Sequence, residues 1–287
     1  SCSNPKRRSA SSPGSSSIIS AFSLAAAFSI AYLDFVLFIA SACRAGGYRP
    51  GIRDGSQDSA SESASAETLN LMTTGNFSFE RLLEIGRLLR KFVKVPLVAN
   101  TRDINHREGE ALLEAGFVGA YHAVRLAEGR DTPLKPEKRI QTIRILKDVG
   151  LHWMNCIEPV GPEHSHEEIV DLMFLARQYE ATYSGIMRRI NFPGSPMTRF
   201  GMISELEMAR MVAVSRLVMG TVPSAHCTHE PHSASLLAGA NLFFPEVGAS
   251  PRDGKADTEK GRGHSVEHCH AIQREMEWKP ELPSNCF

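Results

Sequence analysis

Apolar runs of strand length alternate with amphipathic segments along most of the chain, beginning at Leu69. This alternation predicts strands and helices that follow one another in regular order. Six of the predicted strands span residues 69–73, 96–100, 118–124, 182–190, 222–227 and 241–247. The predicted helices include segments at about residues 78–93, 107–115, 136–149, 204–219, 233–240 and 265–278.

One stretch, residues 151–168, contains a complete copy of this pattern. It opens with an apolar run, which we predict to be a strand, the fourth of seven in chain order, and it breaks at the turn sequence PVGP. Ser165 followed three places later by Glu168 forms a capping box, in which each side chain satisfies a backbone N–H at the start of a helix. Ser204 and Glu207 repeat the signal at the start of a later helix.

Strands that alternate with helices at this spacing are expected to pair in parallel, with right-handed crossovers between them. Seven strands are one fewer than a (β/α)8 barrel requires. The sequence therefore predicts an α/β fold, an incomplete TIM-type barrel of parallel strands, over residues 69–287 and ending in a C-terminal helix. An apolar segment and a linker take the place of the first β/α unit.

Residues 1–68 differ from the rest of the chain in composition. Residues 1–17 are rich in Ser with a few basic residues, which predicts disorder, and residues 44–68 are rich in Gly, Ser, Ala and acidic residues, which predicts a linker. Residues 18–43 are almost wholly apolar. This apolar segment is long enough to cross a membrane, but Asp34 near its middle would cost about 2.5–3.5 kcal/mol. A signal sequence, a helix packed on the barrel and an aberrant start of the reading frame are the other interpretations. Membrane insertion is not the favoured one.

The charges of the chain cancel, with 32 Lys and Arg against 32 Asp and Glu. Nucleic acid requires a basic surface, so the composition argues against it as a partner. Six cysteines are scattered without a CxxC pair, which is typical of reduced thiols rather than of a disulfide framework. We therefore expect a cytoplasmic protein.

The functional groups of such a barrel lie at the C-terminal ends of its strands. The sixth predicted strand ends in a cluster that contains His226, Cys227, His229 and Glu230. Cys227 and His229 share one face of the strand, so together with Glu230 they are candidate zinc ligands. No spaced partner for them is evident, and no metal site is predicted. The preferred interpretation is a polar substrate pocket with His226, His229 and Glu230 as catalytic residues. A third interpretation, after zinc binding and the substrate pocket, is that these side chains only pack in the structure.

Other strand ends supply further candidates for contact with a substrate. Asn155 follows the apolar run of the central stretch, and Arg188 and Arg189 follow the fifth predicted strand. A guanidinium binds a carboxylate bidentately, which makes these arginines, with Arg125 and Arg139, candidate anion clamps. Salt bridges at the surface are the alternative, and that alternative is strongest for Arg139.

Several runs, in order, resemble a known family. They are "ALLEAGFVGAYHAVRLAEGRDT", "KRIQTIRILKDVGLHWMNCIEPVGPE", "RRINFPGSPM", "MARMVAVSRLVMG" and "LLAGANLFF". From residue 69 to about 248 they resemble the radical S-adenosylmethionine (SAM) enzymes, specifically the biotin-synthase-like group. The resemblance implies a TIM-type barrel that uses SAM and a [4Fe–4S] cluster on a small-molecule substrate, often in cofactor biosynthesis. It also implies an electron donor such as flavodoxin or ferredoxin.

By position, the resemblance assigns cofactor contacts to particular residues. Thr74 and Gly75 would approach the SAM amino group, and Arg139 would meet its carboxylate. Val160 and Gly161 would pack near adenine. Two further residues, Arg125 and Glu128, stand where the group places polar contacts to SAM or substrate.

The chain departs from the family in the residues that bind iron. The family's cluster is held by a three-cysteine loop after the first strand, whereas only Cys2 and Cys43 precede Leu69 here. Met154 and His229 stand where biotin synthases use further residues for a second, sulfur-donating cluster. The chain is accordingly more similar to relatives that mature the iron-guanylylpyridinol cofactor of hydrogenase.

Three hypotheses follow from the sequence. The first is a radical SAM enzyme of the biotin-synthase-like group without its cluster-binding part, and therefore inactive in radical chemistry as written. The second is a zinc-dependent lyase or hydrolase on the same barrel. The third is a non-catalytic SAM-binding protein.

Overall fold

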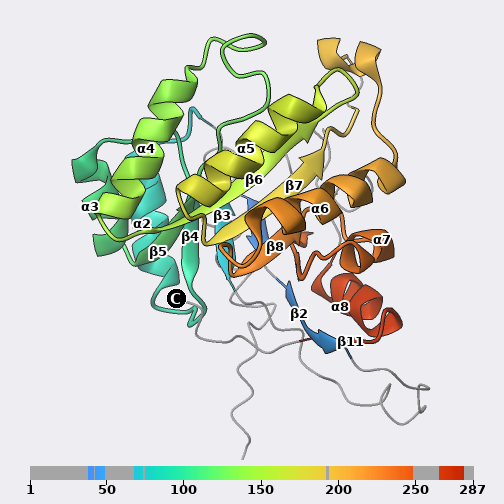
Figure 1. The fold of residues 1–287 in the computed structure, drawn as a ribbon. Coiled ribbons are helices and arrows are strands. Elements are labelled where there is room, and N and C mark those ends of the chain that lie inside the picture. Colours follow the sequence, from blue (N-terminus) through green and yellow to red (C-terminus); the bar gives the residue numbers. More distant parts are fainter. Residues whose placement is uncertain are drawn as a thin grey trace, which may run out of the picture.

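Seven parallel strands form the centre of the fold in the computed structural model, which describes residues 38–41, 43–48, 68–73, 75–191, 194–247 and 265–280. Each strand pairs in parallel with the next along the chain, as predicted. They are β3 (Leu69–Met72), β4 (Leu97–Asn100), β5 (Phe117–Tyr121), β6 (His152–Val160), β7 (Tyr183–Arg188), β8 (Ala225–Thr228) and β9 (Leu242–Phe243). The fold is an incomplete TIM-type barrel (Figure 1).

A helix follows each of the first six of these strands and packs on the outer face of the sheet (Figure 1). They are α2 (Phe79–Leu89), α3 (His106–Glu114), α4 (Pro136–Asp148), α5 (His166–Gln178), α6 (Glu205–Met219) and α7 (Ser233–Leu237). A short 3-10 helix, η2 (Pro196–Phe200), lies between β7 and α6.

The two predicted helix starts are confirmed in position and differ in detail. Ser165 and Glu168 form the complete capping box of α5. Ser204 caps α6 by accepting from the backbone N–H of Glu207, but the Glu207 carboxylate contacts Arg210 instead. The N-terminal cap of α6 therefore depends on the serine hydroxyl.

Two short antiparallel strands stand beside the parallel sheet, where the first unit was missing from the predicted series. Strand β1 (Phe38–Ser41) pairs with β3 and with β10 (Glu246–Val247), and β2 (Cys43–Tyr48) pairs with β9. The sequence analysis assigned no strand to this stretch. Part of the apolar segment 18–43 thus enters the sheet, and its residues 18–37 lie outside the described residues.

The C-terminal end of the chain adds one helix and one strand. Helix α8 (Val266–Glu275) is shorter than predicted, because the chain leaves the helix at Met276 and Glu277 takes a positive φ of 60°. Strand β11 (Trp278–Pro280) then pairs with β2. None of the helices in the described part of the chain is long and apolar enough to cross a membrane.

The sheet separates two apolar cores. The larger core lies between the sheet and the helices, where Leu71, Trp153 and Ile186 of the strands meet Leu112 and Ile143 of the helices. The smaller core faces the inside of the barrel and consists of side chains from the strands and Phe244, without helical residues; its buried members are Val98, Tyr121, Met154, Cys156, Tyr183, Ala225, Cys227, Leu242 and Phe244. Alternate residues of one strand therefore belong to different cores.

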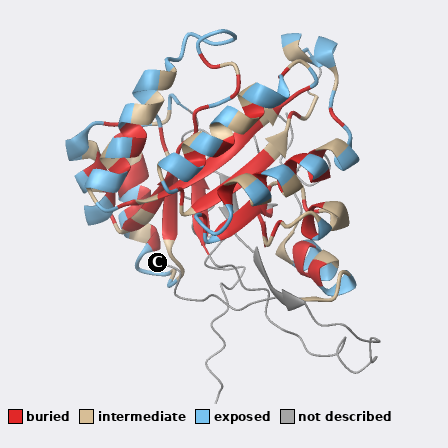
Figure 2. Cartoon of the chain, in the orientation of Figure 1, coloured by how far each residue is buried: buried red, intermediate tan, exposed pale blue. Residues whose placement is uncertain are grey.

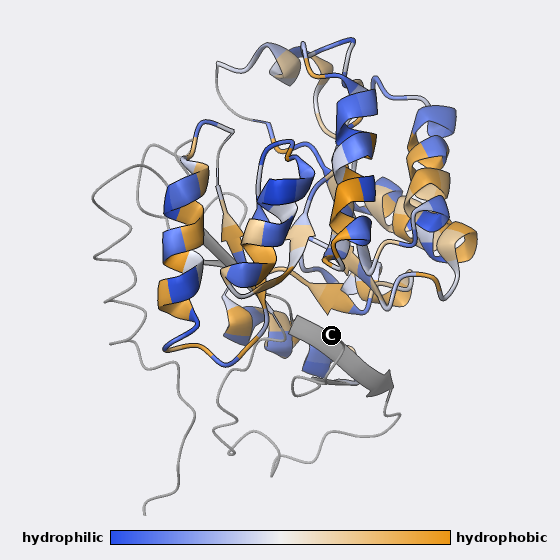
Figure 3. Cartoon of the chain, turned by 90° about the vertical axis from the view of Figure 1, so that its left-hand side faces the viewer, coloured by the Kyte–Doolittle hydropathy of each residue, from blue (hydrophilic) through white to orange (hydrophobic). Residues whose placement is uncertain are grey.

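Burial follows the same division in the helices. Figure 2 shows strands that are mostly buried and helices whose outer faces are exposed. The hydropathy colouring in Figure 3 agrees, because apolar side chains gather on the helix faces turned toward the sheet. The amphipathic pattern along the sequence is thus the pattern of packing on the sheet.

The close approach of α2 to β5 generates a prediction for stability. A Cβ atom at Gly86 would overlap the ring of Phe117, whereas a Cβ at Gly75 would meet nothing within 4 Å. Alanine normally stabilises a helix over glycine by about 1 kcal/mol, but overpacking a core costs about 1–3 kcal/mol. We expect Gly86→Ala to lower the free energy of unfolding, measured in urea, and Gly75→Ala to change it by less than about 0.5 kcal/mol. A stabilising Gly86→Ala would show that α2 does not pack this closely.

Candidate functional site

A buried carboxylate stands at the C-terminal ends of β5 and β6, which lie side by side in parallel. Glu158 accepts a hydrogen bond of 2.6 Å from the Tyr121 hydroxyl, and Arg125 Nη2 lies 3.1 Å from the same oxygen, Oε1. Burial raises the pKa of Tyr121, and the neighbouring Glu158 charge raises it further. Tyr121 is therefore a neutral hydrogen-bond donor at neutral pH.

A chain of alternating charges lies next to this group, between the β4–α3 and β5–α4 connections. Arg139 Nη1 contacts Asp103 at 2.9 Å, and its Nε donates to Glu128 at 3.1 Å. Asp103 also lies 3.2 Å from Nε2 of the buried His122. Although burial opposes it, the contacts of Asp103 with His122 and Arg139 lower the pKa of that carboxyl. Asp103 and Glu128 thus flank one guanidinium as carboxylates.

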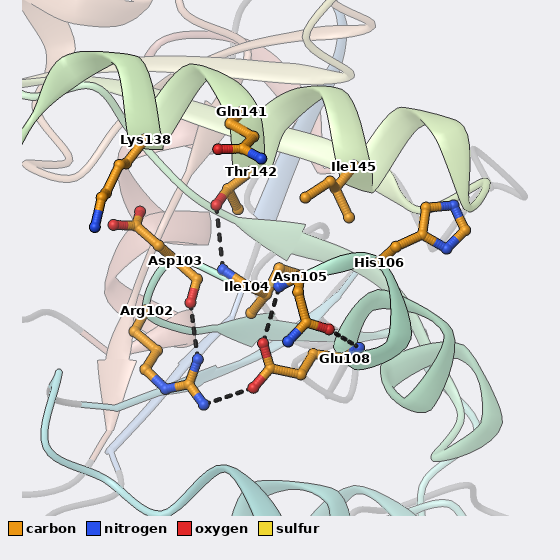
Figure 4. Close-up of a pocket in the computed structure, with 10 residues that line it drawn as sticks. All are labelled: Arg102, Asp103, Ile104, Asn105, His106, Glu108, Lys138, Gln141, Thr142 and Ile145. Atoms are coloured by element: carbon orange, nitrogen blue, oxygen red, sulfur yellow. Dashed lines mark hydrogen bonds and ion pairs between the residues drawn. The ribbon is translucent and has the colours of Figure 1, made fainter.

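A cleft adjoins this charge chain on the outer side of the barrel rim (Figure 4). Its walls are α4 and the β4–α3 connection, and Asp103 is one of the residues that line it. Arg102 closes one end by binding Glu108 at 2.6 Å, and Thr142 accepts from the Ile104 N–H. The Arg102 guanidinium and the Thr142 hydroxyl in the walls of the cleft are thus already paired within the protein.

Arg188 and Arg189 are brought to the same edge, but both are tied to acidic side chains. Arg188 Nε donates to Glu230 at 2.5 Å, and Arg189 forms a two-point ion pair with Glu163. Both arginines also donate to backbone oxygens, those of Ile203 and of Gly201 respectively. Burial raises the pKa of Glu230, which the Arg188 charge opposes.

The cluster at the end of the sixth predicted strand does not lie on one side of the sheet, because successive side chains of a strand point to opposite faces. Cys227 belongs to the barrel interior, and His229 stacks on Phe244 with ring centroids 5.2 Å apart. Tyr121 meets His229 edge to face at 6.5 Å. His229 thus lies within an aromatic group beside the Glu158 carboxylate.

Three of the residues expected at the site face the helices instead. His226 lies near the carbonyl of Gly220 at the end of α6, with Nε2 3.0 Å away, so it does not join His229. Asn155 donates to Ser184 on the helix-facing side, and Val160 is fully buried in the outer core. The two-residue period of a strand turns His226 and Asn155 away from the barrel interior, whereas Val160 faces the outer core because the strand register shifts between Ile157 and Val160.

The predicted glycine contacts have different surroundings. Gly75 is exposed in the loop after β3, and Thr74 lies outside the described residues. Gly161 is buried, and its N–H donates to His164 Nδ1 at 3.0 Å. A Cβ at Gly161 would overlap the Glu163–Arg189 ion pair, so that pair already accounts for the absence of a side chain.

Sequence reasoning missed the residues that hold the site together. Tyr121 lies within the predicted strand 118–124, and Asp103 follows the predicted strand 96–100, but neither is among the predicted site residues. His122 and Glu158 stand near the ends of predicted strands and are assigned no role. The rule that barrel sites lie at strand ends was the signal that could have found them.

The described residues do not provide a metal site. No group of three His, Cys, Asp or Glu side chains converges among them as a metal ion would require. Glu230 is occupied by Arg188, so it is not available beside Cys227 and His229. This arrangement gives the zinc hypothesis no support.

Comparison with known proteins connects the chain to a family. No protein-family model matches it. Over 159 residues it is 30% identical to a biotin synthase of Desulforudis audaxviator strain MP104C, an alignment that covers 52% of this chain and 48% of that protein. The chain is similar to biotin synthase over about half of its own length. It spans about half the length of this relative.

Solved structures agree with the fold of this biotin-synthase-like chain. Methylornithine synthase (PylB) superposes with a TM-score of 0.56 at 16% identity, covering 72% of this chain and 64% of that one. SuiB of Streptococcus suis gives a TM-score of 0.46 at 14% identity, covering 58% and 40% of the two chains, and adds no argument. At this identity the likeness to methylornithine synthase concerns the fold alone.

The Arg139–Glu128 pair generates a prediction for the stability of the site. The Glu128 side chain is 1% exposed, so Arg139→Gln would leave a buried carboxylate without its guanidinium. We expect a loss of about 3 kcal/mol in the free energy of unfolding, because breaking a buried ion pair costs more than the pair contributes.

Two controls distinguish this effect from a general loss of charge. The double variant Arg139→Gln/Glu128→Gln removes the buried charge and should lose less stability than Arg139→Gln. Arg81→Gln breaks an exposed pair with Glu84 and should cost less than about 1 kcal/mol. A similar loss for Arg81→Gln and Arg139→Gln would contradict the assignment.

Proposed function

We propose that the chain is the SAM- and substrate-holding part of a radical SAM enzyme of the biotin-synthase-like group. Its substrate is a small molecule, and we place its reaction in cofactor biosynthesis in the cytoplasm. The relation to biotin synthase over half the chain and the parallel barrel support the family level of this proposal. In the family that the chain resembles, bound SAM is the source of the group that abstracts hydrogen from the substrate.

The single observation that carries the SAM part is the charge chain Asp103–Arg139–Glu128. An α-amino acid group carries an ammonium and a carboxylate, so it needs anionic and cationic partners close together. Arg139 lies between two carboxylates, at 2.9 and 3.1 Å, and therefore offers that combination. Arg139 binds the carboxylate in this proposal, and Glu128 or Asp103 receives the ammonium.

The remaining cofactor assignments receive unequal support. The backbone N–H of Arg125 donates to Glu128 at 3.2 Å, so the two residues form one unit with Arg139. Val160 faces the outer core, and Gly161 is enclosed by Glu163 and Arg189. Any adenine contact near Gly161 would therefore involve backbone atoms and the ion pair beside it.

The residues described by the structure do not fit an iron–sulfur cluster. Such a cluster needs three thiolates close together, and no such group is found among these residues. Burial raises the pKa of the Cys156 thiol well above its ordinary value, which is unfavourable for a ligand that must be ionised. No step is therefore assigned to a cluster held by this part of the chain, and an external electron donor would serve only an intact relative.

The non-catalytic SAM-binding protein is the second candidate, favoured by the same thiol arrangement. Anaerobic reconstitution with iron and sulfide separates it from the enzyme. We expect no cluster absorbance and no release of 5′-deoxyadenosine from SAM. Both signals together would establish the enzyme and overturn the second candidate.

Binding of SAM tests the role of Arg139 without any turnover. We expect calorimetry to give a weaker affinity for decarboxylated SAM than for SAM, because Arg139 meets the carboxylate that the former lacks. Arg139→Lys should lower SAM affinity by about tenfold or more and leave decarboxylated SAM nearly unchanged, since lysine retains the charge but loses the planar two-point contact.

Arg144→Lys is the matched control, because Arg144 lies on the same helix and contacts Tyr179, by a hydrogen bond to its hydroxyl and by lying over its ring. It should leave both affinities unchanged. An equal loss for both ligands in Arg139→Lys would indicate a distorted site. Unchanged SAM binding would contradict the role of Arg139.

A further inference from the structure

Exposure separates one of the four candidate arginines from the other three. The side chains of Arg139, Arg188 and Arg189 are 14%, 15% and 9% exposed, and each is bound by at least two groups. The Arg125 side chain is 51% exposed, and within the described structure its guanidinium pairs with Glu158. Arg125 therefore has donors that a dissolved molecule can reach.

The position of Arg125 is nevertheless fixed. The Glu158 side chain is 6% exposed and is held by the Tyr121 hydroxyl on the oxygen that Arg125 contacts. The backbone is held on both sides, because the Arg125 N–H donates to Glu128 and the Leu126 N–H donates to the Glu158 carbonyl. The guanidinium is thus anchored at one edge by a buried acid, a preorganisation that lowers the cost of binding a ligand.

Flat side chains lie beside this anchor. Tyr121, which holds Glu158, also meets His229 edge to face, and His229 stacks on Phe244. Below them the barrel interior is apolar. Tyr121 and Phe244 are buried and His229 is half-buried, so a ligand held by Arg125 would meet this aromatic group at His229, which contacts the other two rings.

We propose that Arg125 is the substrate's anion anchor, and that the substrate is a small carboxylic acid whose flat or apolar part rests on His229, beside Tyr121 and Phe244. Glu158 and Tyr121 are positioning residues that aim the guanidinium. This inference rests on the proposed function and adds the substrate class to it. The inference assigns different roles to two arginines: Arg139 binds the SAM carboxylate, and Arg125 binds the substrate.

The test uses a matched pair of probes and the full chain. Benzoate and benzamide have the same ring and nearly the same shape, and only benzoate carries a charge. Their dissociation constants, measured by NMR titration of the histidine and aromatic side-chain signals, should favour benzoate by about tenfold or more. Equal affinity for the two probes would overturn the inference.

Substitutions then assign the preference to Arg125. Arg125→Gln should abolish the preference for benzoate over benzamide. Because that change leaves Glu158 without its guanidinium, the double variant Arg125→Gln/Glu158→Gln keeps the test informative if the single variant is unstable. A preference that survives in the double variant, or a loss of SAM binding with benzoate binding intact, would overturn the inference.

The pH dependence provides an independent check against His229. Benzoate and arginine both remain charged between about pH 6 and pH 9, so an Arg125 site predicts a constant preference. An anion held by an imidazolium group would instead lose its preference as the pH rises, because histidine is the side chain that ordinarily changes charge in this range. Fading would assign the anion to the imidazole and overturn the role of Arg125. Failure of SAM binding, measured separately, would count against the proposed function and not against this anchor.

Discussion

The fold and the site both depend on the alternation of side chains along the parallel strands. Each strand gives one set of residues to the helices and the other to the barrel interior, so a shift of one residue exchanges a core position for a site position. This constraint turns His226 toward α6 while His229 meets Phe244. It also places Glu158 near Tyr121, whereas Ile157 packs in the outer core.

Order and type of the elements could be predicted from the sequence, because amphipathic helices and apolar strands carry strong periodic signals. The capping box at Ser165 located the start of α5. The site was less predictable, since histidine and arginine were selected by residue type and their direction was not weighed. Contacts such as Asp103 with His122 and Arg139 join residues far apart in sequence, and no local pattern encodes them.

Acidic side chains decide which basic groups at the barrel rim are available to a ligand. Glu163 occupies Arg189, and Glu230 occupies Arg188. A count of arginines therefore overstates the positive charge that a ligand meets. Positive and negative charges balance at the barrel rim as they do in the whole chain. The ion pairs there orient the guanidinium groups and leave few of their donors exposed.

Strand β1 has a consequence for where this molecule can be divided. It pairs with β3 through residues Phe38–Ser41, although a linker-like sequence separates the two strands. A chain begun at Leu69 would leave the first parallel strand with a row of open backbone donors and acceptors. Such an edge invites association with other chains, so the preceding residues protect the sheet from self-assembly as well as extending it.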